Sequence, residues 1–144
     1  AGATGTLLNH AEHKITDIAK RIATAKKADL LTVVCAANVE EAKAIASLTP
    51  PPDYIAVEPP ELIGGNVSVS KAKPEVVSDS VAAVKSANSS IKVLCGAGVN
   101  SREDVEKALE LGTEGILVAS AVVLAKDPER ALAELIKGVG KDGE

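Results

Sequence analysis

The feature that most constrains the fold is a regular alternation of short apolar runs and helical patterns. The apolar runs are TGTLLNH (4–10), LLTVVCA (30–36), DYIAVE (53–58), IKVLCG (91–96) and EGILVAS (114–120). Helical apolar faces lie between and after them, at Ile15, Ile18, Ile22 and Ala25; at Val77, Val81 and Val84; at Val105, Ala108 and Leu109; and at Leu132, Leu135 and Ile136. A shorter, Ala-rich helix is expected over 39–48. Strands that alternate with helices predict right-handed βαβ crossovers and a parallel sheet.

The alternation predicts an α/β fold of five parallel βα units in one domain, residues 1–144, with no β-hairpin. The runs are apolar on both faces, as expected for strands that are covered on both sides. Helix boundaries are also indicated. SRED (101–104) is typical of a helix start, Gly112 of its end, and DPE (127–129) of an N-cap followed by a proline.

Composition limits the partners. The 144 residues include one tyrosine and no Phe, Trp or Met, so the core must consist of Val, Leu, Ile and Ala. Net charge is −4 and the 16 basic residues are scattered, which argues against nucleic acid. No apolar run reaches the length of a membrane span and no signal peptide is apparent, so we expect a cytoplasmic protein. Cys35 and Cys95 match no zinc or redox spacing and are expected to be reduced core residues, with a disulfide as the alternative.

Glu58 is the first candidate for chemistry, because parallel βα folds place their sites at the C-terminal ends of strands. Pro59 and Pro60 follow it and make the exit from the strand rigid. Gly64 and Gly65 then permit backbone conformations that other residues resist. A rigid base and a flexible tip are typical of a lid that closes over a ligand, and excluding water would help Glu58 act as a base. The alternative is a surface carboxylate that caps a nearby element.

His10 ends the first apolar run and is the second candidate. A neutral imidazole there could polarise a substrate oxygen, and a partly buried, hydrogen-bonded histidine is the alternative. A metal site made of His10, Glu12 and His13 is disfavoured, because their spacing matches no usual ligand pattern. We therefore expect no metal and no cofactor.

Two small-residue segments indicate an anion site. Gly96, Ala97 and Gly98 follow one strand, and Ala119 and Ser120 follow the next. Small residues let backbone N–H groups approach a phosphate, although the first segment could be only a tight turn and Ser120 only an N-cap. A dinucleotide fingerprint would need a glycine at position 101, which is a serine, so a Rossmann fold is excluded.

The order of these motifs resembles archaeal triosephosphate isomerases from residue 1 to about 138. The matching segments are NHAE, VVCA, AVEPPELIG, VSKAKPEVV, VLCGAGV, LGTEGILVAS and VVLAKDPE. The resemblance implies a (β/α)8 barrel, with a glutamate base and a neutral histidine electrophile, for which this family is a standard example. By motif, Glu58 resembles the base, His10 the electrophile and residues 59–70 the closing loop. The resemblance also implies that seven residues lie in the phosphate-binding loops of the family: Gly64, Gly65, Gly96, Ala97, Gly98, Ala119 and Ser120.

The chain also departs from the family pattern. A family member has eight βα units and about 220 residues or more. Here the first three units are expected to be missing, and with them an asparagine and the catalytic lysine of the first strand. Ala11 stands where a serine is expected, and Gly65-Asn66 replaces a more usual Thr-Gly. The sequence predicts the last five units of a barrel, fourth strand to eighth helix.

Five strands cannot close an eight-stranded barrel. The edge strands near 4–9 and 114–119 would leave backbone groups unpaired, and the inner face would expose aliphatic side chains, so we expect a homo-oligomer, most simply a dimer. One functional hypothesis is a triosephosphate isomerase that interconverts glyceraldehyde 3-phosphate and dihydroxyacetone phosphate, weak or inactive as this chain alone. The alternative is a non-catalytic, self-associating partial barrel that still binds a triose phosphate, phosphate or sulfate ion.

Overall fold

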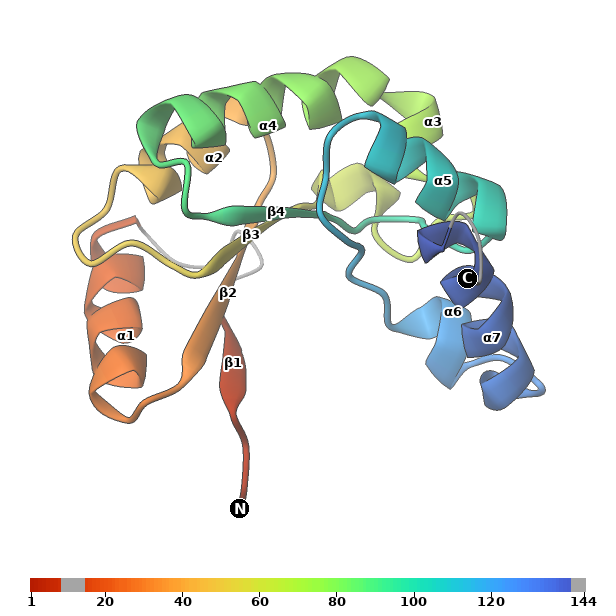
Figure 1. Ribbon diagram of the computed structural model, residues 1–144, viewed down its shortest axis with the longest axis horizontal. Coiled ribbons are helices and arrows are strands. Elements are labelled where there is room, and N and C mark those ends of the chain that lie inside the picture. Colours follow the sequence, from red (N-terminus) through yellow and green to blue (C-terminus); the bar gives the residue numbers. More distant parts are fainter. Residues whose placement is uncertain (9–14, 141–144) are drawn as a thin grey trace.

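The computed structural model describes residues 1–8 and 15–140 and is an open α/β arc (Figure 1). Within these ranges lies a four-stranded parallel sheet in the order β1-β2-β3-β4. Its strands are β1 (Gly5–Leu8), β2 (Leu31–Ala36), β3 (Tyr54–Val57) and β4 (Lys92–Cys95). Strand order follows chain order, as in a barrel, and this confirms the predicted parallel α/β architecture of a partial (β/α)8 barrel.

Helices connect the strands and cover the convex side of the sheet (Figure 1). The elements are α1 (Ile15–Lys27), α2 (Val39–Ala46), the short 3₁₀ helix η1 (Pro60–Leu62), α3 (Val69–Ala72), α4 (Pro74–Ala87), α5 (Arg102–Glu110), α6 (Ser120–Val123) and α7 (Pro128–Val139). The predicted helix starts are confirmed. Ser101 and Asp104 form a capping box on α5, and Asp127 caps α7. Gly112 has a φ of 95°, the left-handed conformation that ends α5.

The core has two parts, both built from aliphatic side chains as the composition predicted. One part joins α1, α2 and α4 to the sheet through Ile18, Ile22, Ile45, Val34, Ile55, Val57, Val84 and Val93. The second lies under α3, α5 and α7 and contains Val69, Val77, Cys95, Val99, Val105, Ala108 and Leu135. Both cysteines are free and buried, which confirms the expectation of reduced core residues.

Two elements differ from the sequence expectations. The run 114–120 forms no full strand, and Ile116 makes only an isolated bridge to Cys95. Three backbone hydrogen bonds still tie residues 114–117 to β4, but no described strand pairs with its other side, so the chain leaves the sheet early. On α7 the expected apolar face is only partly covered. Leu135 is buried, whereas Leu132 and Ile136 are exposed because α7 packs mainly on α5 and α6.

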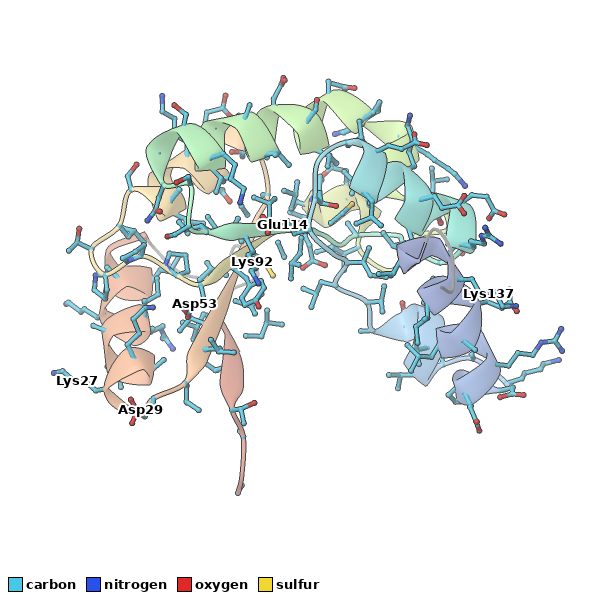
Figure 2. All side chains as sticks on the ribbon, in the orientation of Figure 1. Lys27, Asp29, Asp53, Lys92, Glu114 and Lys137 are labelled. Carbon is cyan, nitrogen blue, oxygen red and sulfur yellow. The ribbon has the colours of Figure 1, made fainter. Side chains whose placement is uncertain are left out.

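The N-terminal ends of the strands carry charged residues (Figure 2). The Asp53 carboxylate accepts hydrogen bonds from the Thr32 backbone N–H (2.8 Å) and hydroxyl (2.9 Å). It also pairs with Lys26 at 3.1 Å. Lys92 lies 5.7 Å from the centre of the Tyr54 ring. These contacts fasten α1 and the starts of β2 and β3, and they leave the opposite edge of the sheet for a site.

The concave side of the sheet is partly uncovered. Leu7 and Leu31 are 47% and 50% exposed, and β1 has a strand partner on one side only among the described residues. No helix within residues 15–140 is long and apolar enough to cross a membrane.

Candidate active site

Glu58 lies at the C-terminal end of β3, where the sequence placed it. Its backbone N–H still donates to the Ala36 carbonyl at 2.8 Å, so the residue is held by the sheet and not by a mobile loop. Alternation along β3 turns its side chain toward the concave side, away from the helices. Glu58 is nevertheless buried, with only 8% of the residue exposed, because the loop after β4 covers it. A surface carboxylate, the alternative at this position, is therefore excluded.

The loop after β4 holds the Glu58 carboxylate through its backbone. Glu58 Oε1 accepts a hydrogen bond from the Ala97 N–H at 3.2 Å. The carboxylate lies directly over Gly96, where an added Cβ atom would be 2.6 Å from Glu58 Cδ. No side chain fits at that distance, so Gly96 is a steric requirement for the position of Glu58.

Cys35 on β2 is a second neighbour of Glu58. Burial and a hydrogen bond to Glu58 raise the pKa of the Cys35 thiol far above its usual value. The thiol therefore stays protonated and donates to the carboxylate. Cys35 lies near the end of the apolar run 30–36, and nothing in the sequence connected it with Glu58. The parallel register that pairs Cys35 with Ala56, two residues before Glu58, brings the two side chains together.

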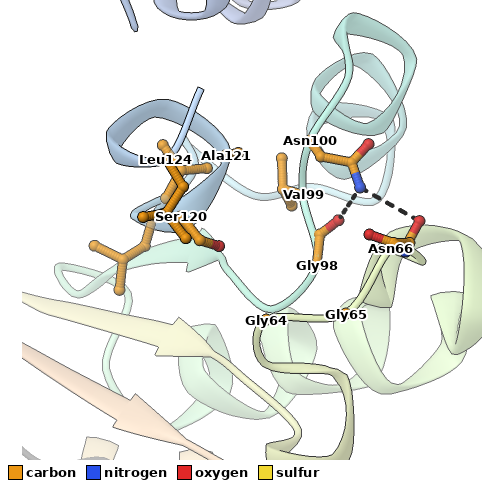
Figure 3. A pocket seen from close by; sticks show the side chains of 11 residues that line it. Gly64, Gly65, Asn66, Gly98, Val99, Asn100, Ser120, Ala121 and Leu124 are labelled. Atoms are coloured by element: carbon orange, nitrogen blue, oxygen red, sulfur yellow. Dashed lines mark hydrogen bonds between the residues drawn. The ribbon is translucent and has the colours of Figure 1, made fainter. Parts of the chain in front are cut away.

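A pocket of about 440 Å³ is lined in part by Gly98, the residue that follows the Ala97 contact to Glu58 (Figure 3). Its lining comes from the 59–67 segment, the loop after β4, the residues before α6 and α6 with its C-cap: Gly64, Gly65, Asn66, Gly98, Val99, Asn100, Leu117, Val118, Ser120, Ala121 and Leu124. All of these residues are uncharged. An anion here would be bound by backbone N–H groups and by the Ser120 hydroxyl.

Two glycines shape the pocket walls. Gly64 has a φ of 71° and Gly98 a φ of 76°, both in the left-handed region that favours glycine. At Gly98 an added Cβ would also lie 2.8 Å from the carbonyl carbon of Val67. The 59–67 segment and the loop after β4 are thus packed backbone against backbone, which only a glycine allows.

The structure places the predicted anion-binding residues in three positions. Gly64, Gly65, Gly98 and Ser120 line the pocket. Gly96 and Ala97 lie under Glu58 instead, and Ala119 precedes α6 as its N-cap. The alternative role of Ser120 as an N-cap is therefore wrong. Because α6 has four residues, its dipole contributes little, and the hydroxyl and the loop backbone remain as donors. His10 lies outside the described residues.

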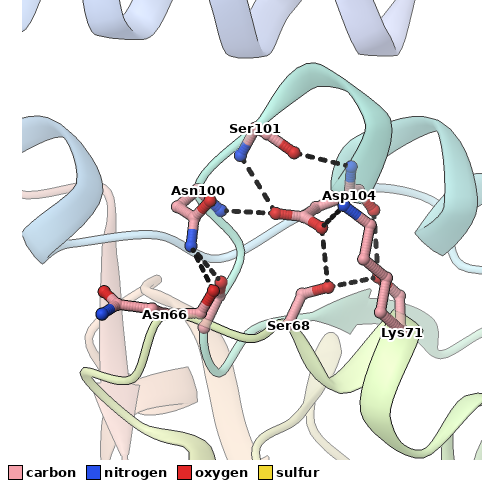
Figure 4. A network of polar contacts seen from close by, with 8 residues as sticks. Asn66, Ser68, Lys71, Asn100, Ser101 and Asp104 are labelled. Atoms are coloured by element: carbon pink, nitrogen blue, oxygen red, sulfur yellow. Dashed lines mark hydrogen bonds and ion pairs between the residues drawn. The ribbon is translucent and has the colours of Figure 1, made fainter.

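A buried polar network behind the pocket was not predicted as part of the site (Figure 4). Asp104 at the start of α5 accepts from the Ser68 hydroxyl (2.8 Å), the Asn100 N–H (3.0 Å) and the Ser101 N–H (3.1 Å). It also pairs with Lys71 at 2.8 Å. Burial raises the pKa of Asp104, but hydrogen bonds from Lys71, Asn100, Ser68 and Ser101 lower it more, to about 2. The sequence showed Asp104 only as part of a helix start.

The parallel strands, the outer helices, and a buried carboxylate and a glycine-lined pocket that share the loop after β4 define a protein of the (β/α)-barrel class, with a site at the C-terminal ends of the strands. The comparisons agree and are more specific. The family model of triosephosphate isomerase matches residues 1–139. The chain belongs to the triosephosphate isomerase family.

Similar proteins support this membership. The chain is 56% identical over 138 residues to the triosephosphate isomerase of Methanothermus fervidus and 54% identical to that of Methanocaldococcus jannaschii. These matches cover 94% of the chain and 61% and 62% of the two relatives. Among solved structures, a thiamine phosphate pyrophosphorylase from Pyrococcus furiosus superposes with a TM-score of 0.66 at 25% identity, over 95% of this chain and 59% of that one.

Proposed function

We propose that the protein interconverts glyceraldehyde 3-phosphate and dihydroxyacetone phosphate, with Glu58 as the base. The observation that carries the proposal is the position of Glu58. Its carboxylate is buried at a strand end and bonded to Ala97, the residue next to pocket-lining Gly98. A phosphate in that pocket would place the carbon atoms of a triose within reach of the carboxylate.

In this reaction Glu58 removes a proton from one carbon of the bound triose phosphate and returns it to the neighbouring carbon. A second proton moves from the hydroxyl oxygen to the former carbonyl oxygen, so the aldose becomes its isomeric ketose and protons and electrons balance without a cofactor. Cys35 stays neutral and orients the carboxylate through its thiol. His10, which lies outside the described residues, polarises the substrate oxygens in this proposal, as the family resemblance implies.

We further propose that the 144-residue chain taken alone converts triose phosphate slowly. We also propose that copies of this chain associate, most simply as a dimer. The chain spans about 61% of the length of the relatives it matches. Among the residues that the structure describes, the pocket lining carries no cationic side chain to balance a phosphate, and this argues for weak transition-state stabilisation. Exposed Leu7 and Leu31 on the concave side favour association. The second candidate function, a self-associating partial barrel that binds an anion, rests on the share of the relatives' length that the chain spans and on the exposed Leu7 and Leu31.

The test compares two glutamine variants of the protein at its natural length. Glu58→Gln keeps the shape of the side chain and removes the base, so kcat should fall about a hundredfold to ten-thousandfold. Glu110→Gln is the matched control, because Glu110 is exposed on α5 and pairs only with Lys107 in the described contacts. A coupled isomerase assay with both triose phosphates measures the rates. Equal rates for Glu58→Gln and Glu110→Gln would contradict the proposed base.

A further inference from the structure

The start of α3 and the start of α5 are joined by a buried polar network that the proposed chemistry does not use. On the α3 side, Ser68 and Ser70 are 1% and 0% exposed. Ser68 donates to Asp104 Oδ1 at 2.8 Å, and Ser70 donates to the Asp104 carbonyl at 3.1 Å. Lys71 pairs with the same Oδ1 at 2.8 Å. One α5 residue therefore fixes three of the four residues that follow the 59–67 segment.

The other oxygen of the same carboxylate fixes the loop after β4. Asp104 Oδ2 accepts from the N–H groups of Asn100 and Ser101, at 3.0 and 3.1 Å. Asn100 in turn lines the pocket and donates from Nδ2 to the carbonyls of Asn66 (3.3 Å) and Gly98 (3.0 Å) (Figure 3). The two oxygens of Asp104 thus hold the residues after the 59–67 segment and the loop after β4, and the 59–67 segment and this loop both line the pocket.

Backbone contacts support the same junction. The Val69 N–H donates to the Ala97 carbonyl at 3.0 Å, and Ala97 is the residue whose N–H holds Glu58. At Gly98 the backbone of Val67 approaches too closely for any side chain. The end of the 59–67 segment is therefore bound directly to the loop that carries both the anion pocket and the contact to Glu58.

We propose that Asp104 is a positioning residue that locks the C-terminal end of the 59–67 segment to the loop after β4, so that the pocket walls are ordered before an anion binds. The identity of the anion rests on the proposed function, whereas the lock itself does not. Figure 4 shows the carboxylate between Ser68 and Lys71 on one side and Asn100 and Ser101 on the other.

The physical effect of the lock is on entropy. A segment fixed at both ends, by Pro59–Pro60 and by Asp104, has little freedom to lose when a ligand orders it. If the Ser68 end is released, the ligand must order at least one more residue. The resulting loss of affinity is about tenfold.

Two serine-to-alanine variants separate the lock from simple helix capping. Ser68→Ala removes the hydroxyl that donates to Asp104. Ser101→Ala removes a hydroxyl of the same size that accepts from the Asp104 N–H at 3.2 Å, and it leaves both carboxylate oxygens bonded. Both variants delete one oxygen next to Asp104, so a purely structural role predicts similar results for the two.

The measurements are amide hydrogen exchange and 2-phosphoglycolate binding, on the protein at its natural length. In Ser68→Ala the amides of Gly65 and Val69, bonded to Leu62 and Ala97 in the structure, should exchange at least tenfold faster. The dissociation constant for 2-phosphoglycolate should rise about tenfold. In Ser101→Ala both quantities should stay within about twofold, although the protein loses some stability.

Each outcome decides the proposal. Equal effects of Ser68→Ala and Ser101→Ala on exchange and affinity would overturn the lock. If Ser68→Ala does not fold, Asp104→Asn, which keeps the side-chain size, carries the same expectation for Gly65 and Val69. If the unaltered protein does not bind 2-phosphoglycolate, the proposed function fails, and the exchange rates alone still decide whether Asp104 holds the segment.

Discussion

Replacing Gly96 with alanine tests whether the position of the Glu58 carboxylate requires a residue without a side chain beneath it. The added Cβ would lie 2.6 Å from Glu58 Cδ, whereas ordinary contact between such atoms begins at 3.4 Å. The backbone of Gly96 is fixed by its hydrogen bond to the Val57 carbonyl, so the carboxylate has to move and not the strand. It must retreat by about 1 Å.

A displacement of about 1 Å at a reacting group costs on the order of a hundredfold in rate. We therefore expect kcat of Gly96→Ala to fall about a hundredfold. The anion pocket is lined by Gly98 and not by Gly96, so the affinity for 2-phosphoglycolate should change by less than about threefold. The overpacking should lower the free energy of unfolding by about 1–3 kcal/mol.

The assays are coupled isomerase kinetics, ligand titration and urea unfolding on the same preparations. Gly140→Ala is the matched control, because an added Cβ there meets nothing within 4 Å and the residue has a negative φ. An unchanged kcat in Gly96→Ala, with the Ala97 N–H still bonded to Glu58, would refute the steric argument.

Two further predictions follow from charge and exposure. The pKa of Asp104 is depressed to about 2, so its stabilising effect is complete above the unfolded-state value near 4 and is lost as the pH falls through that range toward 2. The difference in unfolding free energy between the unaltered protein and Asp104→Asn should therefore shrink by about 2 kcal/mol between pH 5 and pH 2; a pH-independent difference in urea titrations would contradict this. For the 144-residue chain alone, Leu7→Lys on the half-exposed β1 should reduce self-association in light scattering, because a charge on an edge strand opposes pairing. A compact monomer at micromolar concentration before the substitution would show that the association was wrongly inferred.

The helices and strands that could be predicted from the sequence are those whose packing partners also lie in this chain. The run 30–36 and the face of Ile18 and Ile22 predicted β2 and α1, because each buries one repeating set of side chains against the other. The run 114–120 and the face of Leu132 and Ile136 had the same local pattern. In the structure the first forms only a bridge to β4, and the second is a half-exposed face of α7. Periodicity predicts which side chains a segment can bury, but it does not show whether another element is present to cover them.

The site was predictable to a similar degree. Glu58 was identified from its strand and its two prolines, which are local signals. The roles of Gly96 and Asp104 depend on partners 38 residues earlier and 36 residues earlier in the chain, Glu58 and Ser68. In the sequence, Gly96 is accounted for by a tight turn and Asp104 by a helix start. Nothing in the sequence therefore indicated their contacts with Glu58 and Ser68, which are distant along the chain. His10 stays a prediction, since it lies outside the described residues.

The loop after β4 connects the parts of this site more than any other segment does. Ala97 holds the carboxylate of Glu58, Gly98 and Asn100 form one wall of the pocket, and Asp104 joins the same loop to Ser68. A shift of this loop would disturb both the carboxylate contact at Ala97 and the pocket wall, although the backbone of Glu58 stays on the sheet. A shift of the 59–67 segment alone would change the pocket and leave Glu58 in place. Substitutions in the loop should therefore impair rate and affinity together wherever they move its backbone, whereas Gly96→Ala, which moves only the carboxylate, should separate the two.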